Sequence, residues 1–332
     1  MMQPRISVSF FTTFLYLTSV SFSGEEVFNP EVSGYYKNLF SVTDQQAGEA
    51  DLLDDYQRLR FKVKIEPVEW MDINIHYEVR TVSGDTLRLQ QQRETSDDVP
   101  FQRLALNPNT RARFLDVEST FHSENNLLGF HALDRLRLRF RDDMIQLSLG
   151  RQAVSWGTGL IWNPTDLFTA FAPTEIDRDE KMGVDVIRLT WTSDDGTSID
   201  FIGEPLDKQS PYAFDGDDSS WAVRARMHRG EYEISALGGY MATDWVIGGD
   251  FTGYVRDAGF RGEWVYTTVD EADERDYVRG LLSLDTSFPT RWDVYVAIEY
   301  YYNGLGAGNE DAISRTSFSR IGAATTGSRY GL

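Results

Sequence analysis

The segment Gln57–Ile65 alternates between basic and apolar side chains almost without a break. Side chains of a β-strand point alternately to its two faces, so such a strand has one charged face and one apolar face. The same alternation recurs at Trp70–Val79 and at Asp134–Arg141. Many strands of this kind, each about 9–11 residues long and separated by turns, are the sequence signature of a transmembrane β-barrel. The pattern therefore predicts an all-β fold, and more closely a transmembrane antiparallel up-and-down β-barrel.

The alternation along the whole chain predicts about thirteen strands in the barrel wall. These wall strands are Tyr35–Val42, Gln57–Ile65, Trp70–Val82, His131–Arg141, Met144–Ser155, Gly183–Thr192, Ser198–Pro205, Ser220–His228, Tyr232–Ala242, Trp245–Thr252, Ala258–Val269, Tyr277–Ser287 and Trp292–Asn303. A further strand at Phe114–Phe121 is assigned to an excursion outside the wall. Short turns and longer loops alternate between the strands, which matches the periplasmic and extracellular ends of outer-membrane barrels.

The predicted number of wall strands is odd. Single-chain bacterial barrels normally have an even number of strands. Residues 304–332 show no apolar alternation and do not end on a strand with a terminal aromatic residue. We therefore predict that the barrel is incomplete at its C-terminus, and that the sheet is open with Tyr35–Val42 and Trp292–Asn303 as its edges.

The N-terminus has the pattern of a secretory signal. Arg5 provides a short positive region, Ile6–Val20 is apolar and rich in hydroxyls, and small residues Ser21 and Ser23 suit cleavage near Gly24. A membrane anchor is the alternative, but the run is shorter than the roughly 18 apolar residues that span a bilayer. The sequence thus predicts a signal peptide at residues 1–23 and a barrel domain at residues 24–332, exported to the outer membrane of a Gram-negative bacterium.

Composition excludes several classes of function. The net charge of −20 disfavours nucleic acid as a partner. The absence of cysteine excludes disulfides and thiol catalysis. The acidic runs Asp177–Glu180 and Asp215–Asp218 lack EF-hand spacing, so solvated loops are favoured over calcium sites. We predict no catalytic residue, no cofactor and no metal ligand.

The strongest electrostatic feature is a set of basic residues on the charged strand faces. The pore-lining candidates are Arg58, Arg60, Lys62, Lys64, Arg135, Arg137, Arg139, Arg151, Arg188, Arg224 and Arg226. Rows of Arg and Lys in a pore favour anions. The alternative is structural, since eight carboxylates have the same parity and could neutralise them: Asp72, Glu78, Asp200, Glu233, Glu263, Asp285, Asp293 and Glu299. The structural alternative is slightly favoured.

The fifth predicted strand ends in a local motif. It reads Gly-Arg-Gln-Ala-Val-Ser-Trp-Gly at residues 150–157 and continues through Asn-Pro-Thr-Asp-Leu-Phe at 163–168 and Lys-Met-Gly-Val-Asp at 181–185. With Leu133–Leu136 before it, this stretch resembles a group of outer-membrane porin-like barrels that includes the alginate-export type. The match covers about Leu133–Val186; elsewhere only the strand alternation agrees. The resemblance implies a passive or export channel and says little about the solute.

The segment after the motif mixes apolar side chains with prolines, so it is expected to pack against the protein. Either it folds into the lumen and narrows the pore, or it covers the barrel mouth. Its constriction-loop candidates are Trp156, Gly157, Gly159, Trp162, Asn163, Pro164, Asp166 and Phe168. Glycine tolerates positive φ and so suits the sharp turn after Trp156.

Arg151 conflicts with strict alternation, which would place it on the lipid side with Leu147 and Leu149. An arginine there costs roughly 2–4 kcal/mol at mid-bilayer and less toward the interface. Either Arg151 lies at the outer interface, or Gly150 forms a bulge that turns it inward. The bulge is slightly favoured.

Together these features predict a channel that is not an enzyme and passes small hydrophilic solutes, with anions as one option. Its other partners would be outer-membrane lipid and lipopolysaccharide. Two alternatives remain open: an outer-membrane lipase or protease, for which His76 is the one tempting residue, and a non-conducting barrel for assembly, adhesion or polymer export. The sequence leaves the solute and the oligomeric state open.

Overall fold

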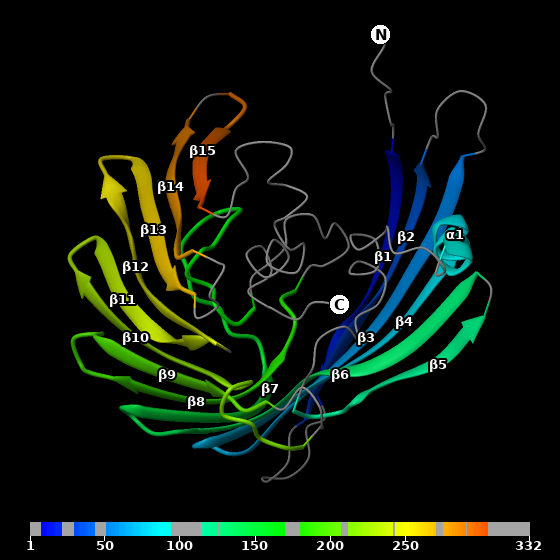
Figure 1. Cartoon of the computed structure of the whole chain (residues 1–332), viewed down its shortest axis with the longest axis horizontal. Coiled ribbons are helices and arrows are strands. Elements are labelled where there is room, and N and C mark those ends of the chain that lie inside the picture. Colours follow the sequence, from blue (N-terminus) through cyan, green and yellow to red (C-terminus); the bar gives the residue numbers. More distant parts are fainter. Residues whose placement is uncertain are drawn as a thin grey trace. The chain divides into compact units, whose positions relative to one another are not determined.

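The computed structural model describes residues 8–21, 30–43, 51–93, 114–124, 126–169, 180–206, 212–241, 243–269, 275–289 and 291–304. The chain divides into two compact units. The first unit contains residues 1–109 and 117–138, and the second contains residues 110–116 and 139–332. Each unit is a set of antiparallel strands (Figure 1).

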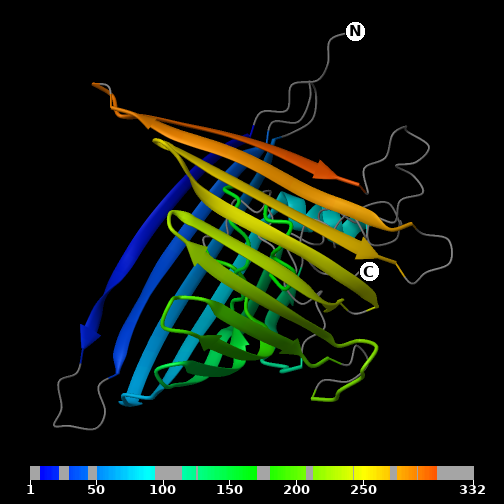
Figure 2. The same cartoon turned by 90° about the vertical axis from the view of Figure 1, so that its left-hand side faces the viewer.

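The first unit consists of long strands and one helix. Its strands are β1 (Val8–Ser21), β2 (Glu31–Thr43), β3 (Leu52–Val68), β4 (Met71–Gly84), β5 (Glu118–Glu124) and β6 (Leu127–Arg141), the last of which continues into the second unit. The strand order is β1-β2-β3-β4-β6, and β5 pairs with β6 off this path. Figure 2 shows β1 to β4 side by side.

Helix α1 (Asp85–Arg93) follows β4 directly and packs against β3 and β4. Its first turn is held by Asp54 of β3, whose carboxylate accepts hydrogen bonds from Thr86 N at 2.9 Å and from Thr86 Oγ1 at 2.6 Å. A carboxylate at this end satisfies backbone N–H groups that have no partner within the helix. The sequence pattern predicted no helix or strand over this stretch, so the helix was missed.

The second unit is a meander of shorter strands. They are β7 (Ile145–Gln152), β8 (Val184–Thr192), β9 (Ser198–Glu204), β10 (Ser220–Arg229), β11 (Tyr232–Met241), β12 (Asp244–Val255), β13 (Ala258–Thr268), β14 (Tyr277–Phe288) and β15 (Val294–Asn303). Each strand pairs antiparallel with the next one along the chain. The predicted all-β, antiparallel up-and-down arrangement is confirmed, and all thirteen predicted wall strands are present.

One predicted edge is wrong. Strand β2 contains Tyr35–Val42 and is paired along its length with β1, for example Tyr16 with Tyr35, so β1 begins the strand order. Aromatic and β-branched residues, which favour strands, make up much of β1, although the sequence pattern placed them in a signal peptide. Cleavage near Gly24 stays a prediction; it would remove β1. The other edge is confirmed, because β15 is the last strand of a linear order.

Strands β8–β15 have two contrasting faces. One face, here called the exposed face, carries large apolar side chains that are more than a third accessible: Ile187, Leu189, Trp191, Ile199, Phe201, Trp221, Met227, Ile234, Trp245, Ile247, Trp264, Val278, Leu282, Leu284, Val294, Val296, Ile298, Tyr300 and Tyr302. The opposite face carries buried polar residues and part of a hydrophobic cluster. No helix in the described ranges is both long and apolar enough to cross a membrane.

Candidate functional site

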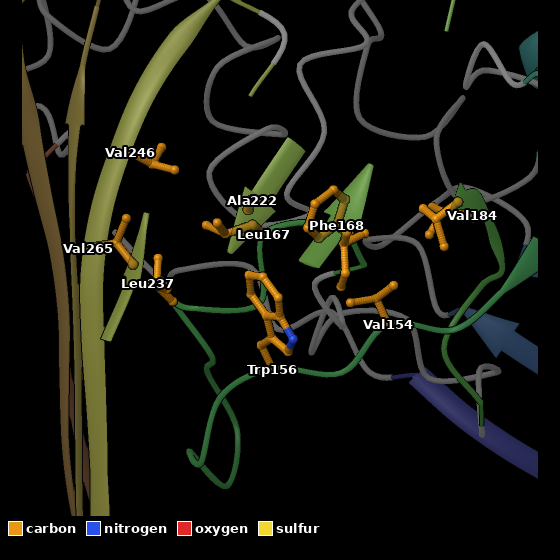
Figure 3. Packing of buried hydrophobic residues seen from close by; sticks show 11 residues of the cluster. Val154, Trp156, Leu167, Phe168, Val184, Ala222, Leu237, Val246 and Val265 are labelled. Atoms are coloured by element: carbon orange, nitrogen blue, oxygen red, sulfur yellow. The ribbon is translucent and has the colours of Figure 1, made fainter. Parts of the chain in front are cut away.

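Residues 154–169, here called the loop segment, lie on the second face of β8–β15, which we call the loop face. Val154, Trp156, Leu167 and Phe168 form one buried cluster with strand residues of that face (Figure 3). The strand members are Val184, Val186, Ile202, Ala222, Leu237, Val246 and Val265. Trp156 and Phe168 pack edge to face with ring centroids 5.7 Å apart. The apolar ends of the segment are therefore anchored by burial.

The middle of the loop segment is held by Glu263 of β13. Its Oε1 accepts hydrogen bonds from the backbone N–H groups of Thr158 and of Gly159, the latter at 2.7 Å. Its Oε2 accepts from Thr165 N at 3.1 Å and from Thr165 Oγ1 at 2.8 Å. Hydrogen bonds to a charged acceptor are roughly twice as strong as neutral ones. One buried carboxylate thus fixes both sides of the turn.

Glu299 of β15 holds the tip of the same segment. Its two carboxylate oxygens accept the N–H groups of Leu160 at 2.8 Å, Ile161 at 3.1 Å and Trp162 at 2.8 Å. The indole of Trp162 stacks on the ring of Tyr301, with centroids 5.0 Å apart and planes inclined by 11°. The tip is therefore bound to β15 by three main-chain bonds and one ring contact.

Two glycines allow the tight path of the segment. Gly157 has φ +93°, and a Cβ there would lie 2.7 Å from Asn163 Oδ1. A Cβ on Gly159 would collide with the carbonyl oxygen of Trp162. The carbonyl of Asn163 closes the turn by accepting the N–H of Asp166 at 3.1 Å across the buried Pro164. The predicted role of glycine in a sharp turn is confirmed at Gly157.

Asp166 is an almost fully buried carboxylate in the loop segment. It forms an ion pair with Lys181 and accepts the Trp156 N–H at 3.5 Å. Burial raises the pKa of Asp166 to about 7, although Lys181 and the Trp156 N–H oppose that shift. The indole N–H of Trp156 donates to Asp200 of β9 at 3.0 Å.

All eight constriction-loop candidates lie within the loop segment, on the loop face.

Most of the basic candidates in the first unit are paired with carboxylates. Arg60 lies 2.8 Å from Glu78 and also forms an ion pair with Asp134. Glu78 additionally pairs with Arg80 and lies 3.9 Å from Arg58. Among the other candidates, Arg137 pairs with Asp72 at 3.0 Å, Arg135 with Asp134 at 2.6 Å and Lys64 with Glu66 at 3.1 Å. Lys62 differs, because it lies over the ring of Tyr35.

Three arginine candidates of the second unit also lie beside carboxylates. Arg188 pairs with Asp200 at 2.7 Å and Arg224 with Asp250 at 2.8 Å, while Arg226 lies 3.6 Å from Glu233. Arg139 is half-buried in β6. Glu263 and Glu299, which the sequence also placed on this face, bind the loop segment instead of an arginine. The geometry favours the structural alternative for the basic residues over an unneutralised basic ladder.

Arg151 is fully buried and forms a bidentate pair with Asp185, its cross-strand neighbour. The β7–β8 register continues through Gly150 without a shift, so the bulge that we favoured is absent from this pairing. Gly150 has φ +96°. The pair is covered by the peptide of Leu115, whose N–H donates to Asp185 at 2.9 Å and whose carbonyl accepts from Arg151 at 2.5 Å. Strand alternation could not predict that Asp185 and the backbone of Leu115 bind Arg151, because both are distant from it in the sequence.

The histidines and the acidic runs that the sequence analysis considered are the remaining features to place in the structure. No group of three or more His, Cys, Asp or Glu there could hold a metal ion. His76 lies with its Nδ1 3.0 Å from Arg60 Nη2. Residues Asp177–Asp179 of one acidic run, and the chain from Leu305 onward, lie outside the described ranges.

Comparison with models of known protein families finds no match, and comparison with curated proteins finds no significant match. The resemblance to porin-like barrels therefore stays a prediction. Sequence reasoning missed the roles of Glu263 and Glu299. Parity placed both carboxylates on the loop face, but only the folded loop segment reveals that their partners are backbone N–H groups.

Proposed function

We propose that the chain forms an outer-membrane channel for small hydrophilic solutes, narrowed by the loop segment. The observation that carries this proposal is the contrast between the two faces of β8–β15. Large apolar side chains cover the exposed face, while ion pairs such as Arg188–Asp200 and Arg224–Asp250 lie on the loop face. A lipid-facing strand alternates in this way, apolar outward and polar inward.

The size of the apolar surface supports lipid contact. Ile187, Ile234, Ile247, Leu282 and Ile298 are each between 48% and 69% accessible. Soluble monomers rarely expose contiguous apolar patches larger than a few hundred Å². Only α-helices and closed β-barrels provide every backbone N–H and C=O group with a hydrogen-bond partner in lipid. The proposal therefore requires that the sheet close, so that no unpaired strand edge faces lipid.

The charges on the loop face determine the selectivity expected of the channel. Because most basic candidates lie in ion pairs, the wall would present little net positive charge to a solute. The channel would therefore discriminate mainly by size, at the loop segment, and only weakly by charge. Tight binding of one solute class is not required for such diffusion.

A reconstitution experiment tests this function. The protein would be refolded in detergent, inserted into liposomes, and assayed for swelling with neutral sugars of increasing size. The proposal predicts swelling with small sugars and a size cut-off. A protein that remains monodisperse in buffer without detergent would contradict the membrane assignment. Insertion without swelling would instead favour a non-conducting barrel, and ester or peptide hydrolysis would favour the enzyme alternative.

A further inference from the structure

We propose that Glu263 and Glu299 are positioning residues that fix the width of the channel by holding the tip of the loop segment, residues 158–165, against the strands. This inference rests on the proposed channel function. It assigns to the two carboxylates a role that is separate from packing of the segment's ends. Different kinds of contact hold the tip and the ends of the segment.

The tip is bound through its main chain. Glu263 collects backbone N–H groups from Thr158, Gly159 and Thr165. Glu299 collects those of Leu160, Ile161 and Trp162. Six N–H groups that no strand or helix satisfies are thus met by two carboxylates, one on β13 and one on β15. Loss of the Glu263 carboxylate leaves the buried N–H of Thr165 without its acceptor, which is costly where water is excluded. Loss of the Glu299 carboxylate removes a charged acceptor from three N–H groups, two of which are exposed.

The ends of the segment are held differently. Val154, Trp156, Leu167 and Phe168 are buried at 3% exposure or less in the hydrophobic cluster. In the tip, by contrast, Leu160 is 43% and Ile161 55% exposed. Besides the hydrogen bonds to the two carboxylates, the tip stacks Trp162 on Tyr301 and places Gly159 over Leu281. The tip can therefore leave the strands while the ends stay packed, so its position depends on the two carboxylates.

Leu281 of β14 lies beneath the tip. A Cβ on Gly159 would lie 3.2 Å from Leu281 Cδ1, and Leu281 is only 3% exposed. Ala222 belongs to the cluster at the ends of the segment and is fully buried. These two positions can report separately on release of the tip and on loosening of the ends. The chain has no cysteine, so single thiols can be introduced without background.

The experiment combines Glu263→Gln or Glu299→Gln with a single cysteine at either Leu281 or Ala222, in the full chain refolded in liposomes. Glutamine keeps the shape but replaces one acceptor oxygen by a donor. The matched control is Asp276→Asn, since Asp276 also accepts a backbone N–H, from Val269, and has no described contact with the loop segment. The readouts are the rate of labelling by a small maleimide and the single-channel conductance.

We expect labelling at Leu281→Cys to accelerate roughly tenfold or more in either glutamine variant, because each loses a charge-assisted hydrogen bond. In the glutamine variants, labelling at Ala222→Cys should stay slow and the single-channel conductance should rise. The control Asp276→Asn should change neither labelling rate.

Faster labelling at Leu281→Cys with unchanged conductance would uphold the role of the carboxylates and contradict the channel function. Unchanged labelling in the double glutamine variant, or equal acceleration at both cysteines, would overturn the inference. If Glu263→Gln fails to fold, Glu299→Gln decides, since its bonds to Leu160 and Ile161 are solvent-exposed.

Discussion

The guanidinium of Arg151 and the carboxylate of Asp185 form a fully buried ion pair across β7 and β8, with Nε 2.8 Å from Oδ1 and Nη2 2.9 Å from Oδ2. The backbone N–H and C=O of Leu115 form additional hydrogen bonds with Asp185 and Arg151, respectively. Because the pair is bidentate and covered, it resolves the conflict between an arginine at this position and the apolar parity of its strand.

Removing one partner of this pair should be strongly destabilising. We expect Arg151→Leu to lower the free energy of unfolding by about 3–5 kcal/mol, because it leaves the Asp185 charge buried without its main partner. The double variant Arg151→Leu/Asp185→Leu should recover most of this loss. Urea titration in detergent measures both. A double variant less stable than Arg151→Leu alone would contradict the pairing.

Arginine on the exposed face should be costly in a depth-dependent way. Leu282 lies near the middle of β14 and Phe288 at its end, and both are on the exposed face. In lipid, Leu282→Arg should cost roughly 2–4 kcal/mol and Phe288→Arg about 0–1 kcal/mol from the charge. Folding yields into liposomes measure the difference. Equal yields would place this face in water, where a surface substitution is nearly neutral.

Neutralising Glu78 should change ion selectivity. Glu78 faces Arg58, Arg60 and Arg80, and Arg60 keeps its second partner Asp134 when Glu78 is lost. We expect Glu78→Gln to shift the reversal potential in a salt gradient toward anions, since three guanidinium groups lose a shared negative charge. Asp195→Asn, at the exposed turn where Asp195 accepts hydrogen bonds from Ser193 and Thr197, is the matched control and should leave the reversal potential unchanged.

Asp166 should give the protein a specific pH dependence. Its folded-state pKa of about 7 lies above its ordinary value of 3.8, so between these pH values the folded state binds a proton that the unfolded state has lost. Stability must then fall as pH rises through this window and level off above about 7. The difference in unfolding free energy between wild type and Asp166→Asn should decrease from about pH 4 to about pH 7. A constant difference would show that Asp166 is ionised throughout, held by Lys181.

The strands could be predicted because their signal is local. Period-two alternation identified β3 and β13 within a few residues of their ends, although β3 extends further on both sides. A strand outside the wall was predicted at Phe114–Phe121. The corresponding strand β5 lies a few residues later, at Glu118–Glu124, and pairs with β6 outside the main strand order. Strand β1 was not predicted, because a run of apolar and hydroxyl residues at an N-terminus fits a signal peptide and a strand equally well.

The candidate site could be predicted only in part. Glycines, prolines and apolar residues indicated that the loop segment packs against the protein, and parity placed Glu263 and Glu299 on the correct face. Which partner each carboxylate takes depends on contacts between distant residues. Asp200 pairs with Arg188 as alternation suggested, whereas Glu263 and Glu299 bind main-chain groups, for which side-chain patterns carry no signal.

Single-channel conductance in planar bilayers tests the central claim most directly. Wild-type protein should give discrete conductance steps, and deletion of residues 159–172 should give larger steps because the loop segment no longer narrows the pore. Folding of both proteins would be verified beforehand by their resistance to unfolding in detergent at room temperature. Absence of steps from folded, inserted wild-type protein would contradict the account, as would identical step sizes for the two proteins.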